Sequence, residues 1–272
     1  MLKLMYITND PKVAKIVERA GVDRIFVDME VIGKQLRQGG MNTVQSFHTV
    51  QDVAAVRQVL TSSELLVRTN PVHPGLPQEI DAVIEAGADI LMLPYFKTVQ
   101  EVQFFLSCVA GRAKTMLLFE TPEAVDVVDD ILALEGIDEV LIGLNDLHLG
   151  YNRRFMFELL ADGTVERICE HFKKAGVPYG FGGVARVGTG TLPAQCIIGE
   201  HVRLGSQAVI LSRSFCNTAV ITDYQQIEQI FMEEVAKVRD AEREFASCTA
   251  QQLLENKSKV SIAVDMILEN MK

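Results

Sequence analysis

Two acidic residues each follow an apolar run at a point where the chain is expected to turn. Glu120 follows the apolar residues 116–119, and Asp146 follows residues 140–145, which read Val-Leu-Ile-Gly-Leu-Asn. The sequence Thr-Pro-Glu at 121–123 is typical of the start of a helix. Two carboxylates at the ends of successive buried strands indicate a site for a hard divalent cation, Mg²⁺ or Mn²⁺.

Either acid alone could instead be a favourable charge at a helix start, because acidic residues are common there. The two together, on adjacent strands that otherwise end in apolar residues, favour the metal site. An ion held by Glu120 and Asp146 would polarise a carbonyl and stabilise an enolate. Arg68 could bind the carboxylate of the same substrate with its fork of donors.

Polar side chains also stand at the ends of the other expected strands. They are Asp28, Glu30, Asn70, Tyr95, Lys97, Asn145, His148, Arg186, Ser212, Arg213 and Ser214. The catalytic residues of a closed parallel barrel lie at these strand ends. Because alternate side chains of a strand point inward, only some of them can face one point.

The elements that must position these residues alternate strictly between strand and helix. Apolar runs predict strands at 2–7, 24–29, 64–70, 90–94, 116–119, 140–145, 178–184 and 207–212. Helical spacing predicts helices at 11–20, 50–60, 78–86, 98–109, 164–175 and 193–201, and a long helix through 227–238. A further helix is predicted after residue 122, with Val125, Val128, Ile131 and Leu132 on one side. Eight such units favour a (β/α)8 TIM barrel over residues 1–248. The long connection at 30–49 is expected to be functional.

Residues 249–272 extend beyond the eighth unit and predict one more helix. Thr249 and Gln252 have the spacing of a capping box. An apolar stripe follows, formed by Val260, Ala263, Met266, Ile267 and Met271. We expect this helix to pack on a neighbouring subunit of a homo-oligomer; the alternative is that it folds back on its own barrel.

Composition excludes several classes of protein. The chain of 272 residues has a formal net charge of -10, which disfavours a nucleic-acid surface. No apolar run approaches the roughly 20 residues of a membrane helix, and the N-terminus does not read as a signal peptide. The five cysteines are scattered, so we expect reduced thiols in a cytoplasmic protein. A dinucleotide-binding GxGxxG motif near the start is absent.

Five short segments, in order, resemble the HpcH/HpaI aldolase and citrate lyase β-subunit superfamily of pyruvate/phosphoenolpyruvate-type barrels. They are residues 27–30, 66–71, 87–94, 119–124 and 142–147. The resemblance implies that Glu120 and Asp146 bind Mg²⁺ or Mn²⁺ and that Arg68 holds a pyruvate-like enolate. It also implies a metal-dependent carbon–carbon lyase, of the class II aldolase type, acting on 2-oxo acids. A citramalyl- or malyl-CoA-type lyase is the chemical alternative.

The remaining site residues are predicted around these three. We expect Gly143, Leu144 and Asn145 to bind substrate with Arg68, and Asp28 and Glu30 to take part in catalysis. Acid–base chemistry would then use these acids, or water that they hold on the metal.

Two positions depart from the pattern of the aldolases in this superfamily. Those enzymes carry a histidine just after the strand-two acid, where this chain has Val31, and a glutamine where it has Leu118. The usual proton-transfer residue is therefore missing, and His148 is the nearest substitute by sequence position. A catalytically silent, metabolite-binding barrel is a further alternative that follows from Val31.

The last two units carry a possible phosphate site. Residues 179–190 are rich in glycine and contain Arg186, and residues 212–214 read Ser-Arg-Ser with Arg213. Loops after the seventh and eighth strands commonly bind phosphate in this fold. The substrate is therefore expected to be a small oxo acid, either free or phosphorylated. The glycines could equally allow close packing of helices on the barrel.

Overall fold

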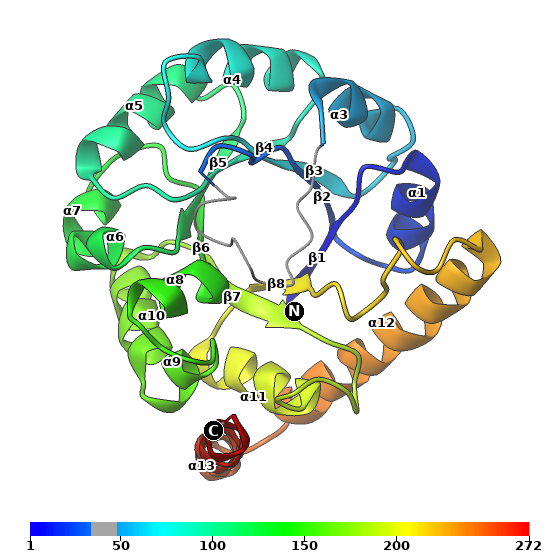
Figure 1. Cartoon of the computed structure of the whole chain (residues 1–272), viewed down its shortest axis with the longest axis vertical. Coiled ribbons are helices and arrows are strands. Elements are labelled where there is room, and N and C mark those ends of the chain that lie inside the picture. The colour runs from blue at the N-terminus through cyan, green and yellow to red at the C-terminus, as the bar shows by residue number, and fades with distance from the viewer. Residues whose placement is uncertain (34–47, 272) are drawn as a thin grey trace.

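The computed structural model describes residues 1–33 and 48–271. Eight parallel strands pair in chain order, and β8 pairs with β1, so that the sheet closes into a barrel (Figure 1). The strands are β1 (Lys3–Ile7), β2 (Arg24–Asp28), β3 (Glu64–Arg68), β4 (Ile90–Leu93), β5 (Lys114–Phe119), β6 (Glu139–Ile142), β7 (Tyr179–Val184) and β8 (Ala208–Leu211). The predicted (β/α)8 barrel is confirmed.

Helices form a ring around the outside of the barrel (Figure 1). They are α1 (Pro11–Arg19), α3 (Val50–Arg57), α4 (Leu76–Glu85), α5 (Val99–Val109), α6 (Pro122–Asp126), α7 (Val128–Leu132), α8 (Leu144–Gly150), α9 (Glu158–Ala161), α10 (Thr164–Ala175), α11 (Ala194–Leu204), α12 (Tyr224–Ala246) and α13 (Ala250–Asn270). Of these described helices, none is long and apolar enough to cross a membrane.

The strands bury both of their faces. One set of side chains fills the barrel interior and comprises Met5, Phe26, Leu66, Ile90, Met92, Met116, Leu118, Leu141 and Ala208. The alternate set packs outward against the helices in a second, larger apolar cluster. This alternation, which follows from the two-residue period of a strand, decides which strand-end side chains face the mouth of the barrel.

Two differences from the sequence prediction concern the segment that follows Glu120 and the segment that contains Asp146. The single helix expected after residue 122 is divided into α6 and α7 at Val127, whose φ of -112° and ψ of 23° interrupt the helix. The strand expected at 140–145 ends at Ile142, and α8 begins at Leu144. Leu144 and Leu147 are both buried on the same side of α8. The apolar run therefore continues although the backbone has changed from strand to helix.

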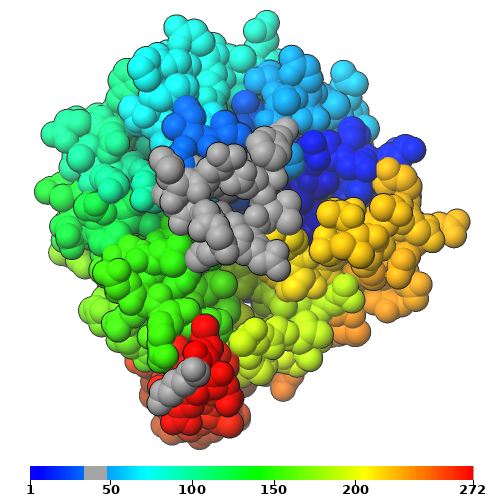
Figure 2. All heavy atoms as spheres, in the orientation of Figure 1, coloured from blue at the N-terminus to red at the C-terminus, as the bar shows by residue number. Residues whose placement is uncertain are grey.

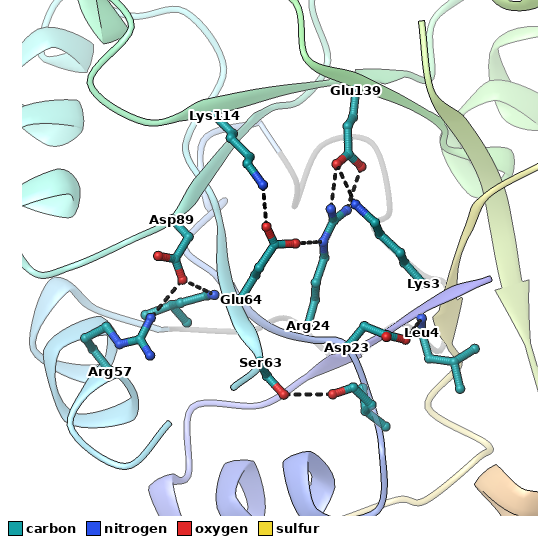
Figure 3. Close-up of polar contacts among 12 residues, drawn as sticks. Lys3, Leu4, Asp23, Arg24, Arg57, Ser63, Glu64, Asp89, Lys114 and Glu139 are labelled. Carbon is teal, nitrogen blue, oxygen red and sulfur yellow. Dashed lines mark hydrogen bonds and ion pairs between the residues drawn. The ribbon is translucent and has the colours of Figure 1, made fainter. Parts of the chain in front are cut away.

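A charged network closes the end of the barrel where the strands begin. Arg24 is fully buried, and its guanidinium bonds to both oxygens of Glu139, Nη1 to Oε2 at 2.7 Å and Nη2 to Oε1 at 2.5 Å (Figure 3). Its Nε donates to Glu64 at 2.8 Å. Lys114 pairs with Glu64 at 2.6 Å, and Lys3 with Glu139 at 3.2 Å. We call these five residues the barrel floor.

The C-terminal helix α13 packs against α11 and α9 of the same chain and lies at one edge of the molecule (red in Figure 2). The predicted capping box between Thr249 and Gln252 is present. Val260 is buried, whereas Met266 is 60% exposed and Ile262 61% exposed. The helix thus folds back on its own barrel with part of its apolar surface, and its place in a subunit interface stays a prediction.

Candidate functional site

Three predicted site residues point into the mouth of the barrel. Asp28, Arg68 and Glu120 each stand two residues after a side chain that fills the barrel interior, so strand alternation directs them inward. All three line a cavity of about 820 Å³ at the C-terminal ends of the strands. This volume lies in the range of cavities that bind small molecules.

Arg68 is held between two acids from the end of β2. Its Nε and Nη2 donate to the two carboxylate oxygens of Asp28 at 2.8 and 2.7 Å, and its Nη1 lies 3.4 Å from Glu30. Burial alone would lower the pKa of Arg68, but the negative charges of Asp28 and Glu30 outweigh burial and raise that pKa above its usual value. The guanidinium is therefore a fixed cation whose orientation two carboxylates determine. Glu30 is not among the described lining residues of the cavity.

Glu120 is buried, and the surrounding backbone fits it closely. The backbone N–H of Tyr95 donates to its Oε1 at 3.0 Å, and Tyr95 adopts a left-handed φ of 48°. That conformation costs a non-glycine residue about 1–2 kcal/mol. On the other side lies Gly143, where a Cβ atom would stand 2.8 Å from both Cβ and Oε2 of Glu120. Glycine is needed at this position because a side chain would displace the carboxylate.

The predicted helix start after Glu120 is present. Thr121 caps α6 through the backbone N–H of Ala124, and Pro122 occupies the first turn. The Thr121 hydroxyl also donates to the backbone oxygen of Phe96 at 2.7 Å. These bonds tie the end of β5 to the loop that follows β4, which fixes the backbone on which Glu120 stands.

Asp146 comes from the first turn of α8 and is 7% exposed. Asp146 and Glu120 both line the 820 Å³ cavity, and both also line a second cavity of about 440 Å³ with Tyr95 and Lys97. The two acids therefore stand where the walls of both cavities meet. Residues 143–145, which precede Asp146, line the larger cavity as well.

The structure adds His48, which was not singled out from the sequence. It is the residue before Thr49, the N-cap of α3, and it lines the larger cavity. The backbone N–H of Asp28 donates to its Nδ1 at 3.0 Å. The available signal was the long connection at 30–49, which was expected to be functional. Residues 34–47 of that connection lie outside the described part of the chain.

Other candidates separate into those that line the cavity and those that do not. Ser212 and Arg213 line it, and so does Leu118. Within the described residues, Arg186 is not part of the wall and donates through Nε to the backbone oxygen of Phe215. The substitute base considered from the sequence, His148, is not part of either wall.

His148, Val31 and Arg213 differ in their surroundings. His148 is buried, and its Nδ1 lies 3.1 Å from the backbone oxygen of Leu144 within α8. Val31, where related aldolases carry histidine, is 45% exposed, and its backbone N–H donates to Asn70. Burial lowers the pKa of Arg213, and the negative charge of Asp28 opposes this effect.

The donor set fits a hard divalent cation. Among the described residues, the mouth contains the carboxylates of Asp28, Glu30, Glu120 and Asp146 and the guanidinium groups of Arg68 and Arg213. In residues 1–33 and 48–271, no group of three or more His, Cys, Asp or Glu side chains is arranged to hold a metal. Glu120 and Asp146 would therefore supply two oxygen ligands, and water and substrate the others. Mg²⁺ is commonly bound in this way.

Comparisons with known proteins agree with the barrel fold. The model of the HpcH/HpaI aldolase/citrate lyase family matches residues 3–186. An HpcH/HpaI aldolase from Desulfitobacterium hafniense DCB-2 superposes with a TM-score of 0.61 at 18% identity, over 78% of this chain and 86% of that one. No curated protein matches the chain in sequence.

Two further solved structures share the fold. An HpcH/HpaI aldolase/citrate lyase family protein from Burkholderia cenocepacia J2315 gives a TM-score of 0.64 at 18% identity, over 83% of this chain and 94% of that one. The citrate synthase SbnG gives 0.60 at 16% identity, over 87% and 92%. Since the family model covers more than half of the sequence, the chain belongs to the HpcH/HpaI aldolase/citrate lyase family, which supports a lyase- or aldolase-type function.

Proposed function

We propose that this protein is a divalent-metal-dependent carbon–carbon lyase that forms or cleaves aldols of 2-oxo acids through a pyruvate-like enolate. One observation carries the proposal. Glu120 and Asp146 are both buried and both line the same two cavities, the larger of which also contains Arg68. A Mg²⁺ or Mn²⁺ ion held by these two acids would polarise the carbonyl of the oxo acid.

Arg68 is assigned to the oxo acid itself. Its Nε and Nη2 are taken up by Asp28, so Nη1 is the nitrogen that we assign to a carboxylate or carbonyl oxygen of the substrate. The ion pair with Glu30 keeps that nitrogen in place. We place the substrate oxygens beside residues 143–145, which line the cavity next to Asp146.

The proton-transfer role is assigned to Asp28. In the condensation direction, a proton leaves the methyl group of pyruvate as the enolate forms, and the new alkoxide gains a proton after the carbon–carbon bond is made. Asp28 lines the cavity, whereas Glu30 is not among its described lining residues. We therefore propose that Asp28 exchanges the proton and that Glu30 positions Arg68.

The second substrate is proposed to carry an anionic group, such as a phosphate or a second carboxylate. The cavity extends to Ser212 and Arg213 at the end of β8 and to Gly183 of β7. A three-carbon oxo acid fills only a small part of 820 Å³. Arg213→Ala should lower kcat/KM for phosphorylated or carboxylated aldehydes and leave neutral aldehydes unchanged. An equal loss for both kinds of aldehyde would contradict the assignment.

The proposal as a whole is tested by proton exchange at the methyl group of pyruvate, followed by NMR in D₂O. The exchange should require Mg²⁺ or Mn²⁺ and should be lost in Glu120→Gln. Its absence in the wild-type protein with any divalent ion would favour a silent, metabolite-binding barrel. Condensation of pyruvate with acetyl-CoA but with no aldehyde of a panel would favour the citramalyl- or malyl-CoA-type alternative.

A further inference from the structure

His48 is fixed at the mouth of the barrel by contacts on two sides. It precedes Thr49, which caps α3 in a reciprocal capping box with Asp52. Its Nδ1 accepts a hydrogen bond of 3.0 Å from the backbone N–H of Asp28. The imidazole is half-buried and lines the larger cavity together with Asp28 and Arg68.

The hydrogen bond at Nδ1 determines the tautomer of the ring. The backbone N–H of Asp28 can only donate, so Nδ1 must direct its lone pair toward that N–H. In a neutral imidazole the proton is then on Nε2. Protonation of Nδ1 would set two N–H groups against each other and break the contact with Asp28. While this contact exists, Nε2 offers an N–H group and has no lone pair with which to take a proton.

Asp28 therefore orients two donors at once. Its carboxylate holds the guanidinium of Arg68, and its backbone N–H holds the imidazole of His48. Arginine is not deprotonated in proteins, and in this histidine tautomer Nε2 can only donate, because Nδ1 already accepts from Asp28. The wall formed by these three residues is suited to bind oxygen atoms, and neither ring nitrogen of His48 is available as a base.

We propose that His48 donates a hydrogen bond from Nε2 to a carboxylate or carbonyl oxygen of the 2-oxo acid, alongside Arg68, and that it is not the proton acceptor of the reaction. This inference rests on the proposed lyase function, because the ligand that it names is the oxo acid of that reaction. It assigns a substrate-binding role to a residue outside the segments that resemble the superfamily.

Two amide substitutions separate the roles of the ring nitrogens. In His48→Asn, the side-chain oxygen can stand near the position of Nδ1 and accept from Asp28, but no donor reaches the position of Nε2. In His48→Gln, the longer side chain can bring an N–H group near the position of Nε2, and the acceptor beside Asp28 is lost. His171→Gln is the matched control, because His171 pairs with Asp129 at the surface.

The readout is kcat/KM for exchange of the pyruvate methyl protons with Mg²⁺. We expect a loss of about 10- to 100-fold in His48→Asn and a smaller loss in His48→Gln. The unfolding midpoint should follow the opposite order, with His48→Asn the more stable of the two. Rates equal to wild type in both variants would overturn the proposal in favour of a purely structural role. Equal, complete losses in both would overturn it in favour of a base.

The tautomer is measured independently of turnover by NMR of the full-length protein labelled with ¹⁵N-histidine, with His48 assigned from the His48→Asn spectrum. A pyridine-like Nδ1 and a pyrrole-like Nε2 are expected, and a proton on Nδ1 would overturn the proposal. If the wild type shows no exchange, the lyase function fails. The proposal for His48 then depends on calorimetry with pyruvate and Mg²⁺. It stands if His48→Asn binds pyruvate more weakly than His48→Gln, and it falls if their affinities are equal or the wild type does not bind.

Discussion

Each end of the barrel contains an arginine that carboxylates hold in place; Arg24 is fully buried, and the side chain of Arg68 is 15% exposed. At the floor, Arg24 bonds to both oxygens of Glu139 and to Glu64. At the mouth, Arg68 bonds to both oxygens of Asp28 and lies near Glu30. Both ion pairs are bidentate, through Nη1 and Nη2 of Arg24 and through Nε and Nη2 of Arg68, yet we assign a structural role to one and substrate binding to the other.

The two ends differ in their access to a cavity. The floor has three cations and two carboxylates, and each of the five bonds to another member of the set (Figure 3). The mouth opens into the 820 Å³ cavity, whose wall contains Asp28, Glu120 and Asp146. Carboxylates beside a cavity can receive a cation and a substrate, whereas the paired groups of the floor only close the barrel. The difference in function therefore follows from the space beside the charges, and not from the ion pair itself.

The largest expected effect is the loss of activity in Glu120→Gln, with Glu64→Gln as its counterpart at the floor. Removing a metal-binding carboxylate should lower the rate of pyruvate proton exchange by about 10³-fold, because Lewis-acid stabilisation contributes several kcal/mol. Glu64→Gln should keep the exchange rate per folded molecule. The rate of pyruvate proton exchange is measured for both variants and normalised to the amount of folded protein. A comparable loss in Glu64→Gln would break the comparison between the two ends.

Arg24→Met should produce the largest loss of stability. It leaves Glu139 and Glu64 without their shared guanidinium, and removal of one partner from a buried ion pair costs about 3–5 kcal/mol. Urea unfolding followed by circular dichroism measures this loss, and the exchange rate per folded molecule should not change. A cost below about 1 kcal/mol would mean that Lys114 and Lys3 compensate Glu64 and Glu139 without the guanidinium.

The sequence predicted the mouth better than the floor. Glu120 was found because it ends an apolar strand and precedes Thr121 and Pro122, and all three signals are local. Arg24 and Glu139 stand at the starts of strands that are far apart in sequence, and their pairing depends on closure of the barrel. The pattern of neighbouring residues in the sequence contains no information on such a long-range contact.

Two features of the mouth could not be predicted from the sequence either. His48 lies beside Asp28 at the start of α3, although the two residues are 20 positions apart and the sequence between them has no periodic signal. Asp146 was expected at a turn after a strand of residues 140–145, but it lies in the first turn of α8. The sequence did not reveal the transition from strand to helix, because Leu144 and Leu147 are buried and a short apolar run is compatible with both a buried strand and the inner face of a helix.

A smaller effect is expected from Gly143→Ala, with Gly183→Ala as the control on the same cavity wall. The new Cβ at 143 would lie 2.8 Å from Glu120, so the carboxylate must shift and metal affinity should fall by about 10- to 100-fold. At 183 the nearest atom would be the backbone oxygen of Ile210 at 3.4 Å, which is ordinary contact. Calorimetric titration with Mn²⁺ measures the metal affinity of both variants. Equal affinities would show that Glu120 does not need its present position.

The floor should also contribute to the pH dependence of stability. Burial alone would raise the pKa of Glu139, but Arg24 and Lys3 together lower it below its ordinary value near 4.5. The folded protein thus keeps this carboxylate charged at a pH where the unfolded chain has taken up a proton. Its contribution is complete above about pH 4.5 and is lost as the pH falls through the folded pKa.

Glu139→Gln makes that contribution measurable. The stability difference between wild type and variant should be greatest at neutral pH and should narrow below about pH 4.5, by about 1.4 kcal/mol for each unit by which the pKa is lowered. Urea unfolding at a series of pH values gives both curves. Parallel curves over the whole range would mean that Glu139 has the same pKa in the folded and unfolded states.

The smallest effect is expected from Lys97→Ala, at the wall of the smaller cavity. Lys97 pairs with Glu123 at 2.8 Å, and their side chains are 43% and 52% exposed, so the pair should contribute less than about 1 kcal/mol. If substrate is bound only in the larger cavity, pyruvate exchange and aldol condensation should both stay within about twofold of wild type. A loss confined to condensation would instead place the second substrate in the smaller cavity. Because Glu120 and Asp146 line both cavities, the ion would then stand between two substrate subsites.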